Sequence, residues 1–352
     1  MFSLLLKEDK SIYPHILIVL LTLLVSVTGN ALANNDLIYS GIHAFGTSLS
    51  DEGNAFIACG GQSIPPYDNL PGNLNTAPGD SPYARGGHHF SNGSTWVDSL
   101  AKSLDVANSA LPVLQNPVGT NYAQAGTTAI PEGPLGPLPC RVSFGTQIQA
   151  AIDRGGIPDD ALVAVEIGSN DVINAVLFFV GAITEGGFDP LTANVITKTT
   201  VLEPAADFTT LGINQLIAGG ASTLLWATVP DIGATPAMAI LDAQLQLFGF
   251  PEGLITSTAT DFAETYNDNV QADIQPAIDG GTIVKFDLFQ ILQEIVSGGN
   301  YDMNVTDACV TPNQPPFACS MPDSYLFWDG THPTKATHDF FAEKAMEALG
   351  LQ

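Results

Sequence analysis

Short apolar segments alternate along this chain with longer segments of helical periodicity, and this alternation constrains the fold more than any other feature. Short buried strands that alternate with helices form parallel sheets with helices on both faces. The pattern therefore predicts a doubly wound α/β fold, whose functional groups gather at the carboxyl ends of the strands. The predicted strands span residues 37–45, 161–167, 222–229 and 282–286, and the predicted helices span residues 95–104, 144–154, 194–218 and 254–278.

The N-terminal 33 residues have the layout of a secretory signal peptide. Lys7 and Lys10 precede an apolar run over residues 16–27, and small residues follow up to Ala33. A membrane anchor is the competing interpretation, but this run is shorter than the roughly 20 apolar residues of a spanning helix. We expect cleavage after Ala33 and export, periplasmic or extracellular, of one domain covering residues 35–352, because no repeat or composition shift marks a boundary.

The four cysteines of an exported chain favour disulfides over metal ligands. Cys309 and Cys319 bracket a short Pro-rich loop, which favours pairing them with each other and leaves Cys59 for Cys140. The other connectivities stay open, because spacing alone does not decide among them. No two cysteines have Cys-x2-Cys spacing, so we expect no zinc or other metal site.

The charge of the chain excludes one class of partner. The sequence has 36 Asp and Glu residues against 10 Lys and Arg residues, which gives a formal net charge of -26. A nucleic-acid backbone or an anionic lipid surface repels such a chain, and nowhere are more than two basic residues clustered. We therefore expect no nucleic-acid partner.

A serine and a histidine lie at positions where nucleophilic catalysis is chemically reasonable. Ser48 follows the first predicted strand, and Asp329 precedes His332 by three residues, just before a C-terminal helix. The Asp329 carboxylate can hold the His332 tautomer whose second ring nitrogen takes the proton of a serine hydroxyl. Each residue also has a purely structural interpretation. Ser48 is equally a candidate helix cap, and Asp329 and His332 are candidates for a turn residue beside a solvated imidazole ring.

Two further loops after predicted strands offer hydrogen-bond donors. The backbone amides of Ser48 and Gly126, together with the side-chain amide of Asn170, are candidates to hold the oxyanion of a tetrahedral acyl intermediate. The competing interpretations are a tight-turn glycine for Gly126 and a helix cap for Asn170.

These blocks, in this order and spacing, resemble the GDSL or SGNH family of serine esterases and lipases, in particular its secreted branch of lipases, phospholipases and acyltransferases. Residues 46–51 resemble the first sequence block of the family, with Ser48 as nucleophile. Gly126 matches the glycine of the second block, and Asn170 matches the asparagine of the third block. Asp329 and His332 match the last block. The resemblance implies a flavodoxin-like, three-layer αβα sandwich around about five parallel strands. It also implies a Ser48, His332, Asp329 triad and an oxyanion hole made by Ser48, Gly126 and Asn170.

One residue departs from the family pattern. The family usually has Asp at the position of Thr47, where it braces the nucleophile loop. Since all residues expected to do chemistry are present, we expect weakened rather than abolished catalysis. The alternative is a non-catalytic secreted binding protein that retains the fold.

The function expected from the sequence is a secreted carboxylic ester hydrolase that forms an acyl-enzyme. A phospholipase, lysophospholipase or acyltransferase using the same site is the alternative. No zinc-protease, P-loop or dinucleotide motif occurs, so we expect no cofactor. The expected partner is a small ester or lipid, and a monomer is favoured. Residues 172–183 are strongly apolar, which favours a buried helix over the lining of an acyl-chain groove or a surface in transient contact with lipid.

Overall fold

The computed structural model describes residues 38–64, 67–69, 83–84, 88–131, 140–298, 303–310 and 318–351. The predicted signal peptide lies outside these described residues, so cleavage and export stay predictions. From Tyr39 to Gln352 the chain forms one structural unit. Among the helices in the described part of the chain, none has the length and apolar character needed to cross a membrane.

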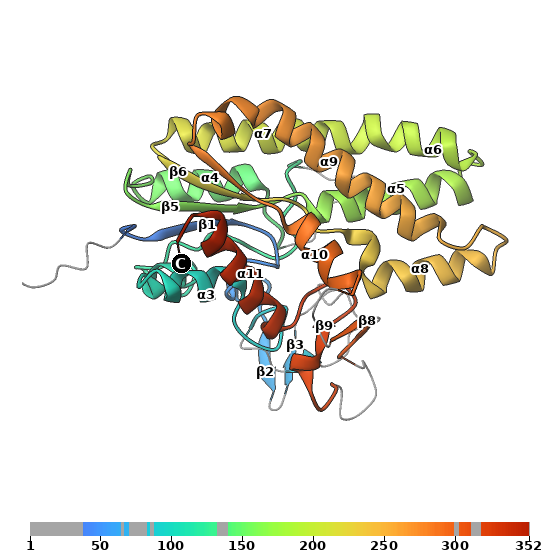
Figure 1. Ribbon diagram of the computed structural model, residues 1–352, viewed down its shortest axis with the longest axis horizontal. Coiled ribbons are helices and arrows are strands. Elements are labelled where there is room, and N and C mark those ends of the chain that lie inside the picture. The colour runs from blue at the N-terminus through green and yellow to red at the C-terminus, as the bar shows by residue number, and fades with distance from the viewer. Residues whose placement is uncertain are drawn as a thin grey trace, which may run out of the picture. The chain divides into compact units, whose positions relative to one another are not determined.

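A parallel sheet lies at the centre of this unit (Figure 1). Its strands are β1 (Ile42–Gly46), β5 (Leu162–Glu166), β6 (Thr223–Ala227) and β7 (Ile283–Phe286), and they are adjacent in this order. All four predicted strands are confirmed. Because the strands are parallel, their carboxyl ends meet along one edge of the sheet.

The outer side of β1 carries a short segment instead of a full fifth strand. Residues 120–124 run parallel to β1, and their backbone forms three hydrogen bonds of 2.7–3.1 Å with Ala44 and Gly46. The far side of this segment bonds the side-chain amide of Asn54, which donates to the carbonyl oxygens of Asn121 and Ala123 at 2.8 Å each. The predicted sheet of about five strands is thus four strands and this edge segment. With the segment counted, the spatial order is that of a flavodoxin-like sheet.

Alternate residues of the strands enter two separate cores. Phe45, Val165 and Trp226 belong to one core, whereas Ala44 and Leu225 belong to the other. This follows from the two-residue period of a strand, since the sheet is covered on both faces and every second side chain points to the same face. The three-layer αβα arrangement predicted for the chain is therefore confirmed.

Helices cover both faces, and Figure 1 shows α7 and α9 on one side of the sheet and α3 and α11 on the other. The first core includes residues of α4 (Phe144–Asp153), α5 (Ser169–Thr184), α6 (Pro190–Thr197), α7 (Glu203–Ala218), α8 (Pro236–Gln246) and α9 (Leu254–Asp279). The second core includes residues of α3 (Trp96–Ser103), α10 (Leu288–Val296) and α11 (Lys335–Ala348). The smaller elements are α2 (Asn54–Ala58), β2 (Gln62–Ile64), β3 (Tyr67–Asn69), β4 (Tyr83–Ala84), β8 (Asn304–Ala308) and β9 (Tyr325–Phe327).

One predicted helix is interrupted. The periodicity predicts a continuous helix over residues 194–218, but a π-helical turn, Lys198–Leu202, separates α6 from α7. Pro204 lies in the first turn of α7, where it has no N–H to donate to an upstream carbonyl. A wider turn just before a proline is an ordinary way to accommodate that missing hydrogen bond.

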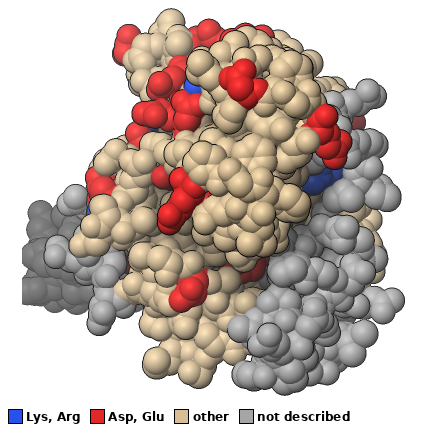
Figure 2. All heavy atoms as spheres, turned by 90° about the vertical axis from the view of Figure 1, so that its right-hand side faces the viewer, with Lys and Arg blue, Asp and Glu red and all other residues tan. Residues whose placement is uncertain are grey.

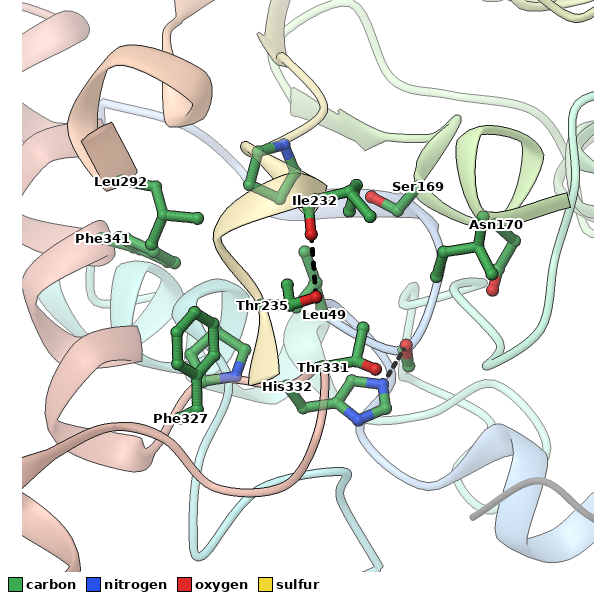
Figure 3. Close-up of a pocket in the computed structure, with 14 residues that line it drawn as sticks. Leu49, Ser169, Asn170, Ile232, Thr235, Leu292, Phe327, Thr331, His332 and Phe341 are labelled. Carbon is green, nitrogen blue, oxygen red and sulfur yellow. Dashed lines mark hydrogen bonds between the residues drawn. The ribbon is translucent and has the colours of Figure 1, made fainter. Parts of the chain in front are cut away.

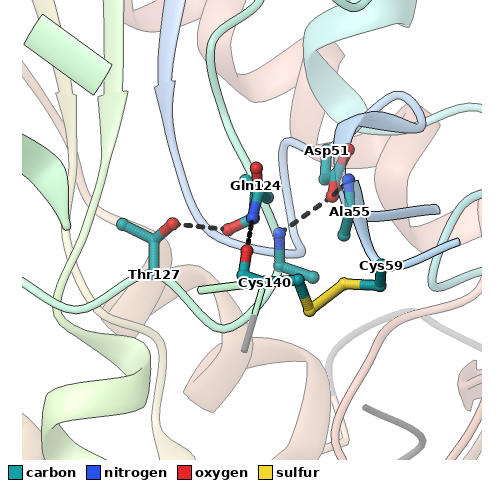
Figure 4. Close-up of a disulfide and its surroundings, with 7 residues drawn as sticks. Asp51, Ala55, Cys59, Gln124, Thr127 and Cys140 are labelled. Carbon is teal, nitrogen blue, oxygen red and sulfur yellow. Dashed lines mark hydrogen bonds between the residues drawn. A yellow bond between two sulfur atoms is a disulfide. The ribbon is translucent and has the colours of Figure 1, made fainter. Parts of the chain in front are cut away.

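Both disulfides have the pairing that the sequence favours, Cys59 with Cys140 and Cys309 with Cys319. Cys59 follows α2, and the backbone carbonyl of Cys140 accepts a hydrogen bond from the Gln124 side chain (Figure 4). The first disulfide therefore connects the end of α2 to the loop that contains Gly126.

Acidic residues are spread over the surface. Figure 2 shows them scattered across one face, with little basic surface between them. This distribution agrees with the net charge of -26 and offers no basic patch on that face.

Candidate active site

The predicted site residues meet at the carboxyl edge of the sheet. Ser48 follows β1, Asn170 lies in the first turn of α5 after β5, and Gly126 follows the edge segment. Asp329 and His332 come from the loop between β9 and α11. Segments far apart in the sequence thus supply one site, as the doubly wound topology predicts.

Ser48, His332 and Asp329 form a continuous hydrogen-bonded chain. His332 Nε2 lies 2.7 Å from Ser48 Oγ (Figure 3), and His332 Nδ1 lies 2.7 Å from Asp329 Oδ2. Asp329 is 1% exposed and His332 is 4% exposed. The second carboxylate oxygen, Oδ1, accepts the backbone N–H groups of Thr331 at 2.7 Å and of His332 at 2.6 Å. The loop thereby holds the carboxylate in the plane where it meets the imidazole.

Of the competing structural interpretations, the turn at Asp329 is present, since its carboxylate accepts the N–H groups two and three residues ahead, but the helix cap and the solvated ring are wrong. Ser48 does not cap the following helix, because the residue before the first turn of α2 is Gly53. His332 is buried rather than solvated, and its ring lies against Phe90 with 5.2 Å between ring centroids. A histidine held between a carboxylate and a hydroxyl is poised to accept the hydroxyl proton.

Asn170 lines the same cavity as Ser48, and Asp51 ties the loop of Gly126 to the nucleophile loop. Among the hydrogen bonds of the described residues, none uses the backbone N–H of Ser48 or of Gly126 as donor. Buried backbone N–H groups without an acceptor are rare, so this pair is available to a bound group. The Asn170 side chain donates one N–H to the carbonyl oxygen of Thr127 at 2.8 Å, which orients the amide and leaves its second N–H free to donate. The helix-cap interpretation of Asn170 is wrong, because Gly168 precedes α5 as its cap.

Sequence reasoning missed the groups that brace these loops. Asp51 is fully buried, and its carboxylate accepts the backbone N–H groups of Gly53, Asn54, Ala55 and Ala125 at 2.6–3.0 Å. It therefore ties the nucleophile loop to the residue just before Gly126. Burial raises the pKa of Asp51 to about 6, and these hydrogen bonds oppose that rise. Its place inside the first motif block was the signal that could have identified it.

Two more side chains brace the same loops. Gln147 accepts the N–H of Gly46 at 2.9 Å and donates to the carbonyl of Gly46 at 2.8 Å and to Thr127 Oγ1 at 2.9 Å. Asp171 accepts the backbone N–H of Ala129 at 2.9 Å, and burial raises its pKa to about 7. Asp171 follows Asn170 directly, but no local pattern distinguishes Gln147 from an ordinary helical residue.

An apolar cavity opens beside Ser48 and His332 (Figure 3). Its volume is about 40 Å³, and its apolar lining includes Leu49, Ile173, Ile232, Leu292, Phe327 and Phe341. A cavity of this kind, with a few polar groups at one end, is typical of a small-molecule site. Ile173 belongs to the apolar run over residues 172–183, most of which is buried in the core or packed against it, as favoured from the sequence. In the described part of the chain, no three His, Cys, Asp or Glu side chains are grouped so as to hold a metal ion.

Gly126→Ala is expected to lower kcat for ester hydrolysis by about 10²-fold, the usual effect of losing one oxyanion donor. Gly126 has φ +80°, a backbone conformation that alanine adopts only with strain, so the loop is expected to relax and displace its N–H. Gly145→Ala is the matched control, because that helical glycine lacks positive φ and a Cβ atom there would make only an ordinary contact, 3.8 Å from Ser143 Oγ. Equal kcat values for the two variants would argue against a role of the Gly126 amide.

Comparison with known proteins agrees with this geometry. The family described as GDSL-like Lipase/Acylhydrolase matches residues 42–345. "GDSL esterase/lipase 6" of Arabidopsis thaliana is 23% identical over 353 residues, covering 91% of this chain and 89% of the relative. "Thermolabile hemolysin" of Vibrio parahaemolyticus is 24% identical over 325 residues, covering 87% of this chain and 62% of the relative. The chain therefore belongs to the GDSL-like lipase/acylhydrolase family and is an ester-hydrolysing serine hydrolase.

Proposed function

We propose that this protein is an exported carboxylic ester hydrolase that uses Ser48, His332 and Asp329 to form and hydrolyse an acyl-enzyme. The observation that carries the proposal is the hydrogen-bonded chain from Ser48 Oγ through both nitrogens of His332 to Asp329, at 2.7 Å for each bond. The buried apolar cavity beside it supports an acyl ester or lipid as substrate.

In the first half of the reaction, Ser48 Oγ attacks the ester carbonyl carbon while His332 Nε2 takes the hydroxyl proton. The oxygen of the resulting tetrahedral intermediate accepts hydrogen bonds from the amides of Ser48 and Gly126 and from the side chain of Asn170. His332 then gives the proton to the departing alkoxide, so an alcohol leaves and Ser48 carries the acyl group.

In the second half, a water molecule attacks the acyl carbon and gives its proton to His332. The intermediate collapses, the carboxylic acid leaves, and the proton returns to Ser48. Asp329 keeps one ring orientation throughout and stabilises the imidazolium. Its burial and its two backbone hydrogen bonds support this role.

Export and a monomeric state belong to the same proposal. Two disulfides, which persist mainly in oxidising compartments, and the N-terminal apolar run support export. We expect this protein to contact a lipid surface only if its substrates are long-chain esters, because such substrates reside in lipid.

Covalent labelling tests this proposal directly. The folded, oxidised protein is treated with a fluorophosphonate and digested, and the labelled peptide is identified by mass spectrometry. Label on Ser48, together with turnover of p-nitrophenyl esters from acetyl to palmitoyl, is the expected result. Folded protein with neither label nor turnover would instead favour a non-catalytic binding protein.

A further inference from the structure

A buried carboxyl group lies directly beneath the nucleophile loop and takes no part in the proposed reaction. Glu166 is the last residue of β5, pairs with Gly46 across the sheet, and is fully buried. One carboxylate oxygen, Oε2, accepts the hydroxyl of Thr47 at 2.6 Å and the backbone N–H of Thr47 at 3.2 Å. The other oxygen, Oε1, accepts the hydroxyl of Ser169 at 2.9 Å. Glu166 therefore holds the residue just before Ser48 by both its backbone and its side chain.

We propose that Glu166 is a positioning residue for Ser48, acting through Thr47. The proposal rests on the proposed function, in which Ser48 is the nucleophile. Thr47 is the residue at which this chain departs from the expected Asp, and the buried acid lies on the neighbouring strand instead. The hydrogen-bonded pair of Thr47, which follows β1, and Glu166, which ends β5, is here called the Thr47–Glu166 unit.

The backbone leaves little freedom for this unit to shift. Gly46 has φ +153°, and a Cβ atom there would lie 2.1 Å from the carbonyl oxygen of Glu166, so the two strands are in close contact at this pair. Gly46 packs against the backbone of Glu166, and Thr47 is hydrogen-bonded to the Glu166 side chain. These two contacts fix the direction in which the backbone enters Ser48. Displacement of a reacting group by about 1 Å can lower a rate by about 10²-fold, so a brace at this position has a kinetic effect.

The hydrogen-bonding pattern favours an ionised carboxylate over an amide. The three groups that face Glu166 all donate, namely the N–H and O–H of Thr47 and the O–H of Ser169. A carboxylate only accepts, whereas a glutamine would turn N–H donors toward at least one of them. Burying an ionised carboxylate is costly, so its presence here, where an uncharged residue would be less costly, indicates a function.

Protonation of Glu166 links this brace to pH. Burial raises the pKa of Glu166 to about 7, while the hydrogen bonds from Thr47 and Ser169 oppose the rise. The titratable groups that face it are His332, which favours the ionised form, and Tyr266 of α9. Below pH 7 Glu166 gains a proton, so one of its oxygens changes from acceptor to donor and the hydroxyl of Thr47 or Ser169 must rotate to accept it. The brace therefore weakens as the pH falls.

The test compares Glu166→Gln, Thr47→Asp and the double variant with the wild type, using kcat, KM and pH profiles for a p-nitrophenyl ester. Glu166→Gln should lower kcat about tenfold or more with KM changed less than about twofold, because binding contacts stay in place. Thr47→Asp puts two carboxylates within hydrogen-bonding distance in a buried site, where both cannot ionise, and should lower kcat similarly. The double variant leaves a single carboxylate, at position 47, facing an amide that can donate to it, and should recover kcat to within about threefold of the wild type.

The pH profile gives a readout that a purely structural role would not change. In the wild type, kcat should rise as the pH passes through about 7, and Glu166→Gln should lose that part of the rise. Asp242→Asn is the matched control, since Asp242 is also buried and accepts backbone N–H groups of Gly253 and Ile255 but does not line the cavity. It should leave both kcat and the profile unchanged.

Ser48→Ala, measured beside these variants, separates the two proposals. Loss of turnover in Ser48→Ala with unchanged kcat and pH profile in Glu166→Gln would overturn the positioning role alone. A double variant whose kcat is no higher than that of either single variant would also overturn the positioning role of Glu166. This comparison holds even if Glu166→Gln alone folds poorly. Turnover that persists in Ser48→Ala would overturn the proposed function and this inference with it.

Discussion

Ser48→Ala is expected to lower kcat for ester hydrolysis by about 10⁴-fold or more, the largest effect of any single substitution in this chain. Ser48 Oγ is the only atom of the hydrogen-bonded chain that attacks the substrate in the proposed mechanism, and alanine offers no replacement. The fold should be unaffected, because Ser48 caps no helix and its one side-chain hydrogen bond in the described structure is to His332. The measurement is turnover of p-nitrophenyl butyrate, with circular dichroism to check folding.

Ser50→Ala provides the matched control in the same loop. Ser50 is buried, and its hydroxyl accepts a hydrogen bond from the Trp96 indole at 3.1 Å, not from His332. Losing that bond should cost about 1 kcal/mol of stability and leave kcat within a few-fold of the wild type. If Ser50→Ala lost activity while Ser48→Ala kept it, the nucleophile would be Ser50, and its assignment to Ser48 would be wrong.

The parts of the fold that were predictable depend on local pattern. Apolar runs bounded by turn residues predicted β1, β5, β6 and β7, because strands buried on both faces are mainly apolar. The π-helical turn at Lys198–Leu202 was not predicted, because apolar spacing continues through it and only Pro204 marks the change. The sequence favours a surface loop over residues 111–139, because this stretch is rich in Gly, Pro and Asn. That interpretation is wrong for residues 120–124, which are largely buried and pair with β1, a strand remote in the sequence.

In the site, too, residues in local sequence motifs were predictable and residues that act through long-range contacts were not. Each predicted chemical group lies in a short motif at a strand end, where type and position together indicate a role. Gln147 and Glu166 lie outside such patterns, and their roles arise from contacts more than one hundred residues away along the chain. Those contacts exist only once β1 and β5 are paired. The departure at Thr47 therefore has an interpretation only in three dimensions, where its hydroxyl meets the Glu166 carboxylate.

Asp329→Asn is expected to lower kcat by about 10⁴-fold while leaving the loop in place. Asparagine retains an oxygen that can accept the N–H groups of Thr331 and His332, as Asp329 Oδ1 does. Its amide NH2 then faces His332 Nδ1 in place of Oδ2, which accepts there at 2.7 Å. A donor at that position favours the tautomer with the proton on Nε2, and that nitrogen then has no lone pair to accept the Ser48 proton.

The measurement is kcat and KM for a p-nitrophenyl ester, with Asp339→Asn as the control. Asp339 lies on α11 and pairs with Lys335 at the surface, so removing its charge should change kcat less than about twofold. In Asp329→Asn, KM should change little, because Asp329 does not line the cavity and its loss affects the transition state more than substrate binding. An Asp329→Asn enzyme of near-normal kcat would mean that His332 reaches its working tautomer unaided. The hydrogen-bonded chain would then shorten to two members, Ser48 and His332, with Asp329 acting only through the backbone of its own loop.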